Sequence, residues 1–193
     1  MYEKFGQFID GNWSPSENKE TYEVINPATE EVLGHASKAT PADVERALKS
    51  AEQGLQVWKK TPPWQRSYVL RKIADKMREK KDVLAKWMTL ENGKPLAEGV
   101  GETNGAADIF EWNAEETKRI FGQTIESRFE NTRVHVYYQP VGVVAALSPW
   151  NFPLILAARK ISTALAAGCS VIIKPDTITP GVVMELVDIC REC

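Results

Sequence analysis

Two short stretches place residues that could do chemistry directly after apolar runs. In "LSPWNFPLI" (147–155), a proline stands on either side of Trp150 and Asn151, immediately after the run "VGVVAAL". The Asn151 amide offers two donors, which suits the stabilisation of negative charge that develops on an oxygen. Flanking prolines restrict the backbone and would hold such a donor in place. The second stretch is "SVIIKPDT", where Lys174 could meet ribose hydroxyls or phosphate, although a lysine taken alone is usually a solvated surface charge.

The three cysteines are the other reactive candidates. Cys190 and Cys193 form a CxxC motif, which could be a redox pair or half of a metal site. Cys190, however, continues a helical apolar stripe made of Val183, Leu186 and Val187, and the sequence has no second CxxC and only two histidines. Cys169 opens the run that Lys174 closes, so it would lie at the opposite end of that strand. We therefore predict structural roles for the cysteines and no metal site.

The elements around the two stretches predict a parallel sheet. "VGVVAAL" and "SVIIK" are nearly continuous apolar runs, as expected of strands buried on both faces. A helix over 154–167, closed by Gly168, joins them, and a second helix opens at Thr179-Pro180. Two strands joined by one helix should be parallel, and ligands in such sheets bind outside the carboxyl ends of the strands. The turns "SPWN" and "KPDT" are therefore expected side by side in one crevice, with a nucleotide as one candidate ligand.

The N-terminal part predicts a hairpin, then extended segments and then helices. "FIDGNW" signals a hairpin with Asp10-Gly11 at its turn, and "YEVINPATEEVLGHAS" reads as extended segments broken at Asn26-Pro27. Thr40 is the predicted N-cap of a first helix, and a second helical region is expected over 64–90.

A third helix is predicted over 96–121, with Gly122 as its left-handed cap. It contains "GVGETNG" (99–105), which has Asn104 where a dinucleotide fingerprint needs its third glycine. We interpret these small residues as positions of close helix packing. "RVHVYYQ" then alternates as a strand with one covered face would.

Composition and charge exclude several classes of protein. The chain has 193 residues, of which 43% are hydrophobic and 26% charged, and its net charge is −2. These values are typical of a globular protein and favour neither a nucleic-acid nor a membrane surface. The longest apolar runs are too short to span a bilayer, and "MYEKFGQFID" lacks the pattern of a secretory signal. With few cysteines as well, we expect a cytoplasmic protein.

The segment "QPVGVVAALSPWNFPLILAARKISTALAAGCSVIIKPDTITP" closely resembles the aldehyde dehydrogenase superfamily, in which a PWNFP loop is followed by a KP-x-x-x-TP loop. The resemblance extends back through "ENGKPLAEGVGE", "FEWNAEETKRIFGQTI" and "INPATEEVLG", and it is closest to the succinate-semialdehyde dehydrogenase branch. It implies an α/β fold with an N-terminal helical layer and the first half of a Rossmann-like parallel sheet, truncated before the catalytic domain. The implied parts are a hairpin and helical part (1–126), an oligomerisation strand (127–140) and a dinucleotide-binding part (141–193).

The resemblance also implies roles for individual residues. In such enzymes a cysteine thiolate attacks the aldehyde, hydride passes to a nicotinamide, and a glutamate-activated water releases the acid. Asn151 would donate to the oxyanion of the thiohemiacetal, Phe152 would form a wall of the aldehyde tunnel, and Arg159 would bind the far carboxylate of the substrate. The residues implied in cofactor binding are Ser148, Pro149, Trp150, Lys174, Asp176 and Thr177.

The resemblance, and two departures from the family pattern, lead to three further expectations. Thr177 stands where many NAD-preferring members carry Glu, so the cofactor is expected to be NAD or NADP, with NADP tolerated and the preference open. The implied partners are a small aldehyde and, for a full-length enzyme, further copies of the chain in a dimer or tetramer. The family nucleophile and general base would lie beyond Cys193, so these residues alone are expected to be inactive. The alternatives are an inactive cofactor-binding or oligomerisation module, or a dehydrogenase for another aldehyde.

Overall fold

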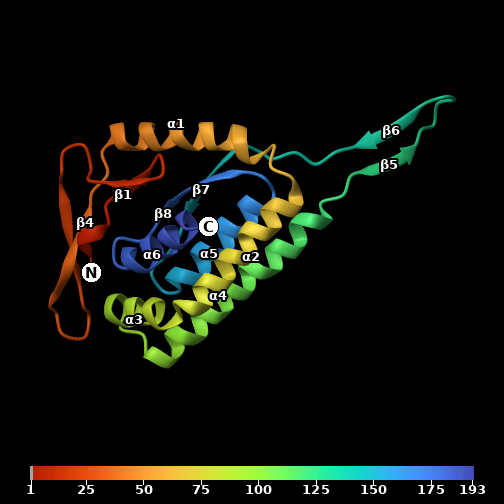
Figure 1. The fold of residues 1–193 in the computed structure, drawn as a ribbon. Coiled ribbons are helices and arrows are strands. Elements are labelled where there is room, and N and C mark those ends of the chain that lie inside the picture. The colour runs from red at the N-terminus through yellow and green to blue at the C-terminus, as the bar shows by residue number, and fades with distance from the viewer. Residues whose placement is uncertain (1) are drawn as a thin grey trace.

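The computed structural model of the protein describes residues 2–193 and has an α/β architecture (Figure 1). The chain order is η1 (Tyr2–Lys4), β1 (Gln7–Ile9), β2 (Asn12–Ser14), β3 (Thr21–Ile25), β4 (Val32–Ser37), α1 (Pro41–Trp58), α2 (Pro63–Glu79), α3 (Lys81–Asn92), α4 (Leu96–Glu116), η2 (Thr117–Arg119), β5 (Gln123–Glu126), β6 (Arg133–Val136), β7 (Val143–Leu147), α5 (Pro153–Ala166), β8 (Ser170–Lys174) and α6 (Pro180–Arg191). The strands pair in sequence as β1-β2, β3-β4, β5-β6 and β7-β8.

The N-terminal extended segments form two antiparallel hairpins, of which the first was predicted as a hairpin and the second only as two extended segments. β1 and β2 are joined by Asp10 and Gly11, whose φ angles of 52° and 74° are both left-handed. This conformation is the one that a tight two-residue hairpin turn requires. β3 and β4 pair on either side of the Asn26-Pro27 turn, in which the Asn26 side chain accepts the N–H of Ala28 at 2.9 Å. Both predicted turns are therefore hairpin turns, and the pairing of β3 with β4 is a finding of the structure.

The predicted helices begin correctly but are divided differently. Thr40 caps α1 in a reciprocal capping box with Asp43, as its sequence indicates. The region predicted over 64–90 is two helices, because the backbone leaves helical geometry at Lys80 (φ −94°, ψ 16°). Apolar residues continue at helical spacing on both sides of Lys80, so periodicity does not detect the break. α3 then ends at Gly93, which is left-handed with φ 76°.

The predicted cap at Gly122 is wrong. α4 ends at Glu116 and is followed by the 3-10 turn η2, and Gly122 is not among the glycines with a positive φ. A Cβ atom at Gly122 would instead lie 2.4 Å from the carbonyl oxygen of Val136. The glycine therefore permits the close approach of two backbone segments at the base of the β5-β6 hairpin, rather than a helix end.

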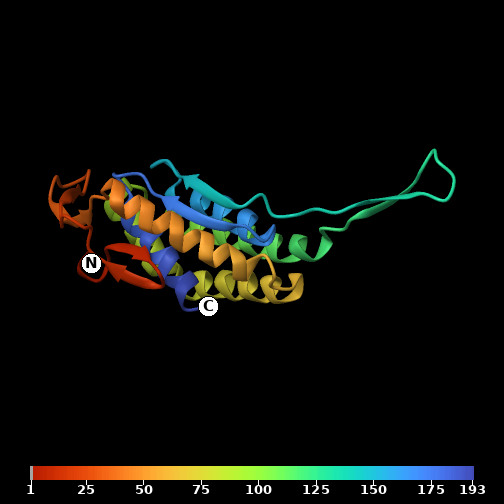
Figure 2. The same cartoon turned by 90° about the horizontal axis from the view of Figure 1, so that it is seen from above.

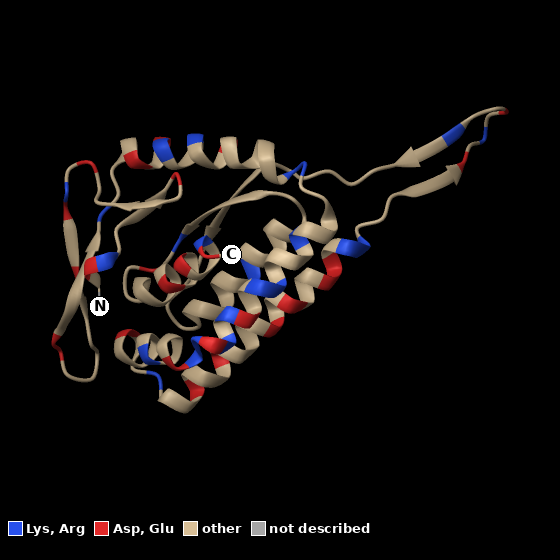
Figure 3. Cartoon of the chain, in the orientation of Figure 1, with Lys and Arg blue, Asp and Glu red and all other residues tan. Residues whose placement is uncertain are grey.

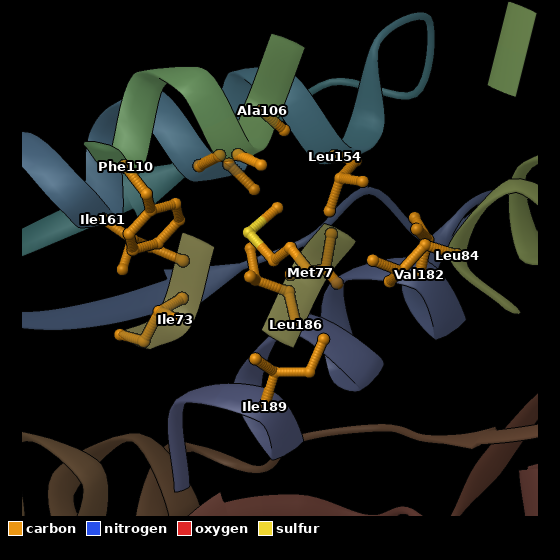
Figure 4. Close-up of a cluster of buried hydrophobic side chains, with 14 of the residues drawn as sticks. Ile73, Met77, Leu84, Ala106, Phe110, Leu154, Ile161, Val182, Leu186 and Ile189 are labelled. Atoms are coloured by element: carbon orange, nitrogen blue, oxygen red, sulfur yellow. The ribbon is translucent and has the colours of Figure 1, made fainter. Parts of the chain in front are cut away.

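The hydrophobic core lies where α2, α4, α5 and α6 meet (Figure 4). Its largest fully buried side chains include Ile73, Met77, Phe110, Leu154 and Leu186. α4 approaches α3 so closely that a Cβ atom at Gly99 would lie 3.0 Å from the carbonyl oxygen of Ala85. The interpretation of "GVGETNG" as a packing segment within a helix is thus confirmed.

β7 and β8 are parallel neighbours joined by α5, as predicted, and Gly168 closes α5 with φ 86°. Helices α1 and α5 both contact this two-stranded sheet (Figure 2). The expectation that both strands are buried on both faces is wrong for the described residues. Ala146 is buried, but Ala145 and Leu147 are exposed and the centre of β8 is half-buried. Each strand has one hydrogen-bonded neighbour here, so the edges of this sheet are open.

β5 and β6 form an antiparallel hairpin that extends away from the body (Figures 1 and 2). The alternation of "RVHVYYQ" predicts one covered face, and this is wrong for Arg133–Val136 within the described chain. Residues on both faces of β5 and β6 are exposed, apart from the half-buried Val136, because the two strands pair only with each other.

Acidic and basic residues are interspersed along the helices and strands (Figure 3). Along the seam between α2 and α4, Arg78 contacts Asp108 at 2.7 Å and Glu111 at 2.6 Å. Pairs of this exposed kind contribute little individually. In residues 2–193 the longest helices are too polar to cross a bilayer.

Candidate active site

The turns that follow β7 and β8 lie side by side, as the sequence predicts. Leu147 and Lys174 are register partners at the carboxyl ends of the two strands. Directly beyond them, the Ser148 N–H donates to the Lys174 carbonyl at 3.2 Å. The parallel pairing thus brings "SPWN" and "KPDT" to one edge of the sheet. This is the position at which open α/β sheets bind ligands.

The predicted site residues on the first turn mostly project into solvent. Trp150 is 51% exposed and Phe152 50% exposed, although both are large and apolar, and Pro149 and Asn151 are also exposed. Ser148 is buried, and its hydroxyl has no hydrogen-bond partner within residues 2–193. An exposed aromatic pair around an amide, beside an orphaned hydroxyl, forms a surface on which a flat ligand could pack.

The predicted residues on the second turn include one available cation. Lys174 is exposed, and its ammonium donates to the Pro175 carbonyl at 3.1 Å. Thr177 is exposed beside it. The Asp176 carboxylate accepts the N–H of Ile178 at 3.0 Å, so it shapes its own turn. An accessible ammonium and hydroxyl suit a ribose or a phosphate.

Arg159 lies on α5, exposed, and forms no ion pair with any acidic group in the part of the chain that the structure describes. It is seven residues from Phe152 along the chain, and Phe152 is the N-cap residue that precedes α5, with a non-helical backbone (φ −134°, ψ 67°). A guanidinium at this place could bind an anionic group of a molecule that contacts Phe152.

The backbone of the first turn is anchored by two side chains from the connection between α3 and α4. Asn92 donates its side-chain N–H to the Trp150 carbonyl at 3.0 Å, and the Lys94 ammonium donates to the Asn151 carbonyl at 3.1 Å. Lys94 also lies 4.2 Å from the centroid of the Phe152 ring, within the range of a cation–π contact. The backbone of the turn is thus held by the α3-α4 connection, while its side chains are exposed.

A buried glutamate caps α5. Pro153 is the first residue of α5, and the N-cap side chain, Phe152, cannot accept a hydrogen bond. The N–H groups of Leu154 and Ile155 instead donate to the Glu102 carboxylate, at 3.0 and 3.1 Å. Glu102 also forms a short, buried ion pair with Lys94. A carboxylate at this place satisfies two free donors and complements the positive end of the helix.

A second buried glutamate caps α6 in the same way. Pro180 is its first residue, Thr179 makes no side-chain cap bond, and the N–H groups of Gly181 and Val182 donate to Glu91 at 2.7 and 3.1 Å. The Tyr2 hydroxyl also donates to Glu91. Burial raises the pKa of Glu91 to about 7, against the opposing effect of these three hydrogen bonds. Each turn is therefore followed by a helix whose first free donors are fixed by an interior carboxylate.

Sequence reasoning missed these four anchoring residues: Asn92, Lys94, Glu102 and Glu91. Three of them belong to "ENGKP", which sequence patterns indicate only as the end of a helix. The backbone partners of the four residues are 52 to 91 residues away along the chain. The one signal in the sequence is Phe152 at the N-cap position of α5. A phenylalanine cannot accept a hydrogen bond, so the helix needs an acceptor from elsewhere in the chain.

The cysteines lie away from these turns. Cys169 is buried just before β8, at the opposite end of that strand from Lys174. Cys190 packs against the core, and burial raises the pKa of its thiol to about 12. Within residues 2–193, no three His, Cys, Asp or Glu side chains gather as metal ligands.

Comparison with known proteins agrees with this geometry. The sequence model of the aldehyde dehydrogenase family matches residues 13–193. The chain is 44% identical, over 95% of its length, to a glutarate-semialdehyde dehydrogenase of Pseudomonas putida, and 41% identical, over 94%, to the succinate-semialdehyde dehydrogenase [NADP(+)] of Escherichia coli. It covers 38% of each of these relatives.

A crystal structure of a Staphylococcus aureus betaine aldehyde dehydrogenase in complex with NAD+ superposes with a TM-score of 0.95 and 36% identity, over 98% of this chain and 39% of that one. The chain belongs to the aldehyde dehydrogenase family.

Proposed function

We propose that these residues form the part of an NAD(P)-dependent aldehyde dehydrogenase that supplies its oxyanion donor and the wall around its nicotinamide. The observation that carries the proposal is the pairing of Leu147 with Lys174, which sets the asparagine turn beside the lysine turn at one edge of the sheet. Neither turn would suffice alone. Together they offer an amide donor and a cation within one surface.

Asn151 is the residue of this chain that would act on the reacting atoms. Its exposed amide would donate a hydrogen bond to the oxygen that becomes negative when a nucleophile adds to the aldehyde carbon. Trp150 and Phe152 on either side would exclude water and strengthen that bond. The nucleophile and the general base would come from residues outside these 193, because the Cys169 thiol is buried far from the turn and the pKa of Cys190 is raised.

The two turns also fit a dinucleotide. Lys174 and Thr177 would bind its adenosine ribose or phosphate, and Ser148, Pro149 and Trp150 would lie against the nicotinamide, with Asp176 shaping the second turn. The bound cofactor would supply the hydride acceptor. Thr177 carries no charge that would repel a 2′-phosphate, which supports use of NADP as well as NAD. The NADP(+) relative and the NAD+ complex support the same pair of cofactors.

The proposed substrate is a short semialdehyde with a carboxylate at its far end. Arg159 supports this choice, because its side chain is exposed on α5, the helix that follows Phe152, and has no acidic partner within the described residues. Two relatives named for glutarate and succinate semialdehydes support the same class.

The proposed function is testable in a chimera. The 193 residues are joined to the part of the Pseudomonas putida relative that they do not cover, and aldehyde-dependent NAD(P)H formation is measured. The chimera is expected to be active and the 193 residues alone inactive. Asn151→Ala should lower kcat by about 100- to 1000-fold, the usual cost of losing one oxyanion donor. A control chimera carries the matching segment of the Escherichia coli relative. If that control is active while ours is not, or if Asn151→Ala retains its rate, the proposal is wrong.

Arg159→Ala in the chimera tests the substrate class. We expect the KM for succinate or glutarate semialdehyde to rise by about 10-fold or more, because a charge-assisted contact is lost. The KM for an uncharged aldehyde of the same length should change little. Equal effects on both aldehydes would contradict carboxylate recognition and would favour a dehydrogenase for another aldehyde.

A further inference from the structure

We infer that Lys94 and Glu102 are positioning residues for the Asn151 amide. This inference rests on the function proposed above, because Asn151 has a catalytic role only there. Neither side chain reaches the solvent-facing side of the turn. Both would act through its backbone.

Lys94 reaches the turn from beneath. Its side chain is 8% exposed, and it lies directly after Gly93, whose left-handed backbone ends α3. From there the ammonium bonds the Asn151 carbonyl at 3.1 Å and lies over the Phe152 ring. A buried ammonium keeps its charge only when it is paired, and Glu102 provides the pair. The lysine thus carries a full charge to the peptide group that follows Asn151.

Glu102 fixes the next part of the same segment. Its side chain is 2% exposed, one oxygen holds Lys94, and the other accepts the N–H groups of Leu154 and Ile155. The carbonyl of Asn151 and the N–H of Leu154 are therefore bound to one buried ion pair. Only one peptide group, between Phe152 and Pro153, lies between the two peptide groups that carry these atoms. Asn92 binds the Trp150 carbonyl on the other side of Asn151, so the peptide groups before and after the Asn151 Cα are both held, and this orients the side chain between them.

The capping of α5 by Glu102 does not by itself explain why Lys94 bonds the Asn151 carbonyl. α6 begins in the same manner as α5, with proline first and a buried glutamate on the second and third N–H groups. Glu91, however, pairs with the neutral Tyr2 hydroxyl, and within residues 2–193 no buried lysine from another segment bonds the turn before α6, where the exposed Lys174 contacts only its own turn. The additional cation is present at the one turn that carries Asn151. A donor is worth most to catalysis when it is held in place beforehand, and a displacement of about 1 Å can cost about 100-fold in rate.

A first experiment measures the turn itself in the 193-residue chain. Tryptophans are replaced by 5-fluorotryptophan, and the 19F resonance of Trp150 is assigned with Trp150→Phe. Lys94→Met and Glu102→Gln are expected to shift or broaden that resonance. Glu91→Gln, which removes the equivalent carboxylate from α6, should leave it in place. An unchanged Trp150 resonance in both folded variants would overturn the inference.

Either single substitution leaves a buried charge or dipole without its partner and could prevent folding. The double variant Lys94→Met/Glu102→Gln removes the buried charge entirely, and the same resonance is then measured in it. Because the double variant also lacks the bond to the Asn151 carbonyl, a shifted or broadened resonance supports positioning. A wild-type resonance there contradicts it.

A second experiment measures rates in the chimera. Lys94→Met and the double variant are expected to lower kcat by about 10- to 100-fold, with the KM for the aldehyde within about threefold of the parent. Lys94→Arg keeps the charge and should recover part of the rate. Lys76→Met, which breaks an ion pair with Glu192 far from the turn, is the control and should retain full activity.

The double variant separates positioning from stability. If the pair only stabilised the fold, removing both charges would restore the rate together with the stability, and that result would overturn the inference. If Asn151→Ala itself leaves the rate of the chimera unchanged, the proposed function fails. The fluorine spectra then decide alone whether the pair positions the turn.

Discussion

Gly181→Ala is expected to lower the free energy of unfolding by about 3–5 kcal/mol, because overpacking and a lost buried hydrogen bond act together. A Cβ atom at this position would lie 2.3 Å from the nearest atom of the Trp87 ring and 2.6 Å from the Glu91 carboxylate. Trp87 cannot easily give way, since it is buried and the Tyr2 ring packs edge-on against it at 5.1 Å. Urea unfolding followed by circular dichroism measures the change.

A second glycine of the chain provides the matched control. Gly101 lies within α4, and a Cβ atom there would meet nothing within 4 Å. Gly101→Ala should therefore stabilise the protein by about 0.5–1 kcal/mol through helix propensity. Trp87→Leu should recover part of the stability lost in Gly181→Ala, because it removes the clashing ring. A Gly181→Ala variant as stable as the parent would show that α6 can move away from α3 at little cost.

The parallel pair β7-β8 and the two adjacent turns could be predicted from the sequence because the information is local. Two apolar runs, one connecting helix and a left-handed Gly168 leave few topologies open. Local sequence patterns did not predict the exposure of β7 and β8 correctly, because no other part of the described chain covers their exposed residues. Strands with apolar runs are expected to be buried, yet Leu147 is exposed, because burial depends on neighbours and not on composition.

The supports of the site could not be predicted for a different reason. Glu91 and Glu102 would each be read as solvated helix residues, since acidic residues are almost never buried without a partner. Their partners are backbone N–H groups of α5 and α6, at Leu154, Ile155, Gly181 and Val182. Any residue can supply such a group, so no side-chain pattern marks the pairing. Only the fold brings the carboxylates and the helix ends together.

The two capping glutamates attach the turns of the candidate site to helices α3 and α4. The asparagine turn is bound through Asn92, Lys94 and Glu102, and the helix after the lysine turn is bound through Glu91. The sheet itself is narrow and open at its edges, so it could not fix both turns alone. Rigidity of the kind that a preorganised donor needs therefore comes from the helical layer.

Glu91→Ala is expected to lower the free energy of unfolding by about 3–5 kcal/mol. The substitution leaves a cavity beside Trp87, and it leaves the Gly181 and Val182 N–H groups and the Tyr2 hydroxyl without their acceptor. Glu91→Gln keeps the volume and one acceptor oxygen, so it should lose less. Urea unfolding at pH 6 compares the two variants with the parent.

Glu91 also predicts how stability depends on pH. Burial raises its pKa to about 7 in the folded protein, from an ordinary value of 4.5, so the folded state holds this proton more tightly than the unfolded state. Its contribution is therefore fully present below pH 4.5 and is lost as the pH rises through 7. The parent should lose about 2–3 kcal/mol of unfolding free energy between about pH 5 and pH 8, because one unit of pKa corresponds to about 1.4 kcal/mol.

The tyrosines around Glu91 should not obscure this slope. Burial raises the pKa of Tyr22 to about 12 and that of Tyr2 still further, so both stay neutral across the range. Glu91→Gln should therefore remove most of the difference between pH 5 and pH 8. If the slope persists in Glu91→Gln, another group holds the proton, and the buried carboxylate at the start of α6 is ionised throughout.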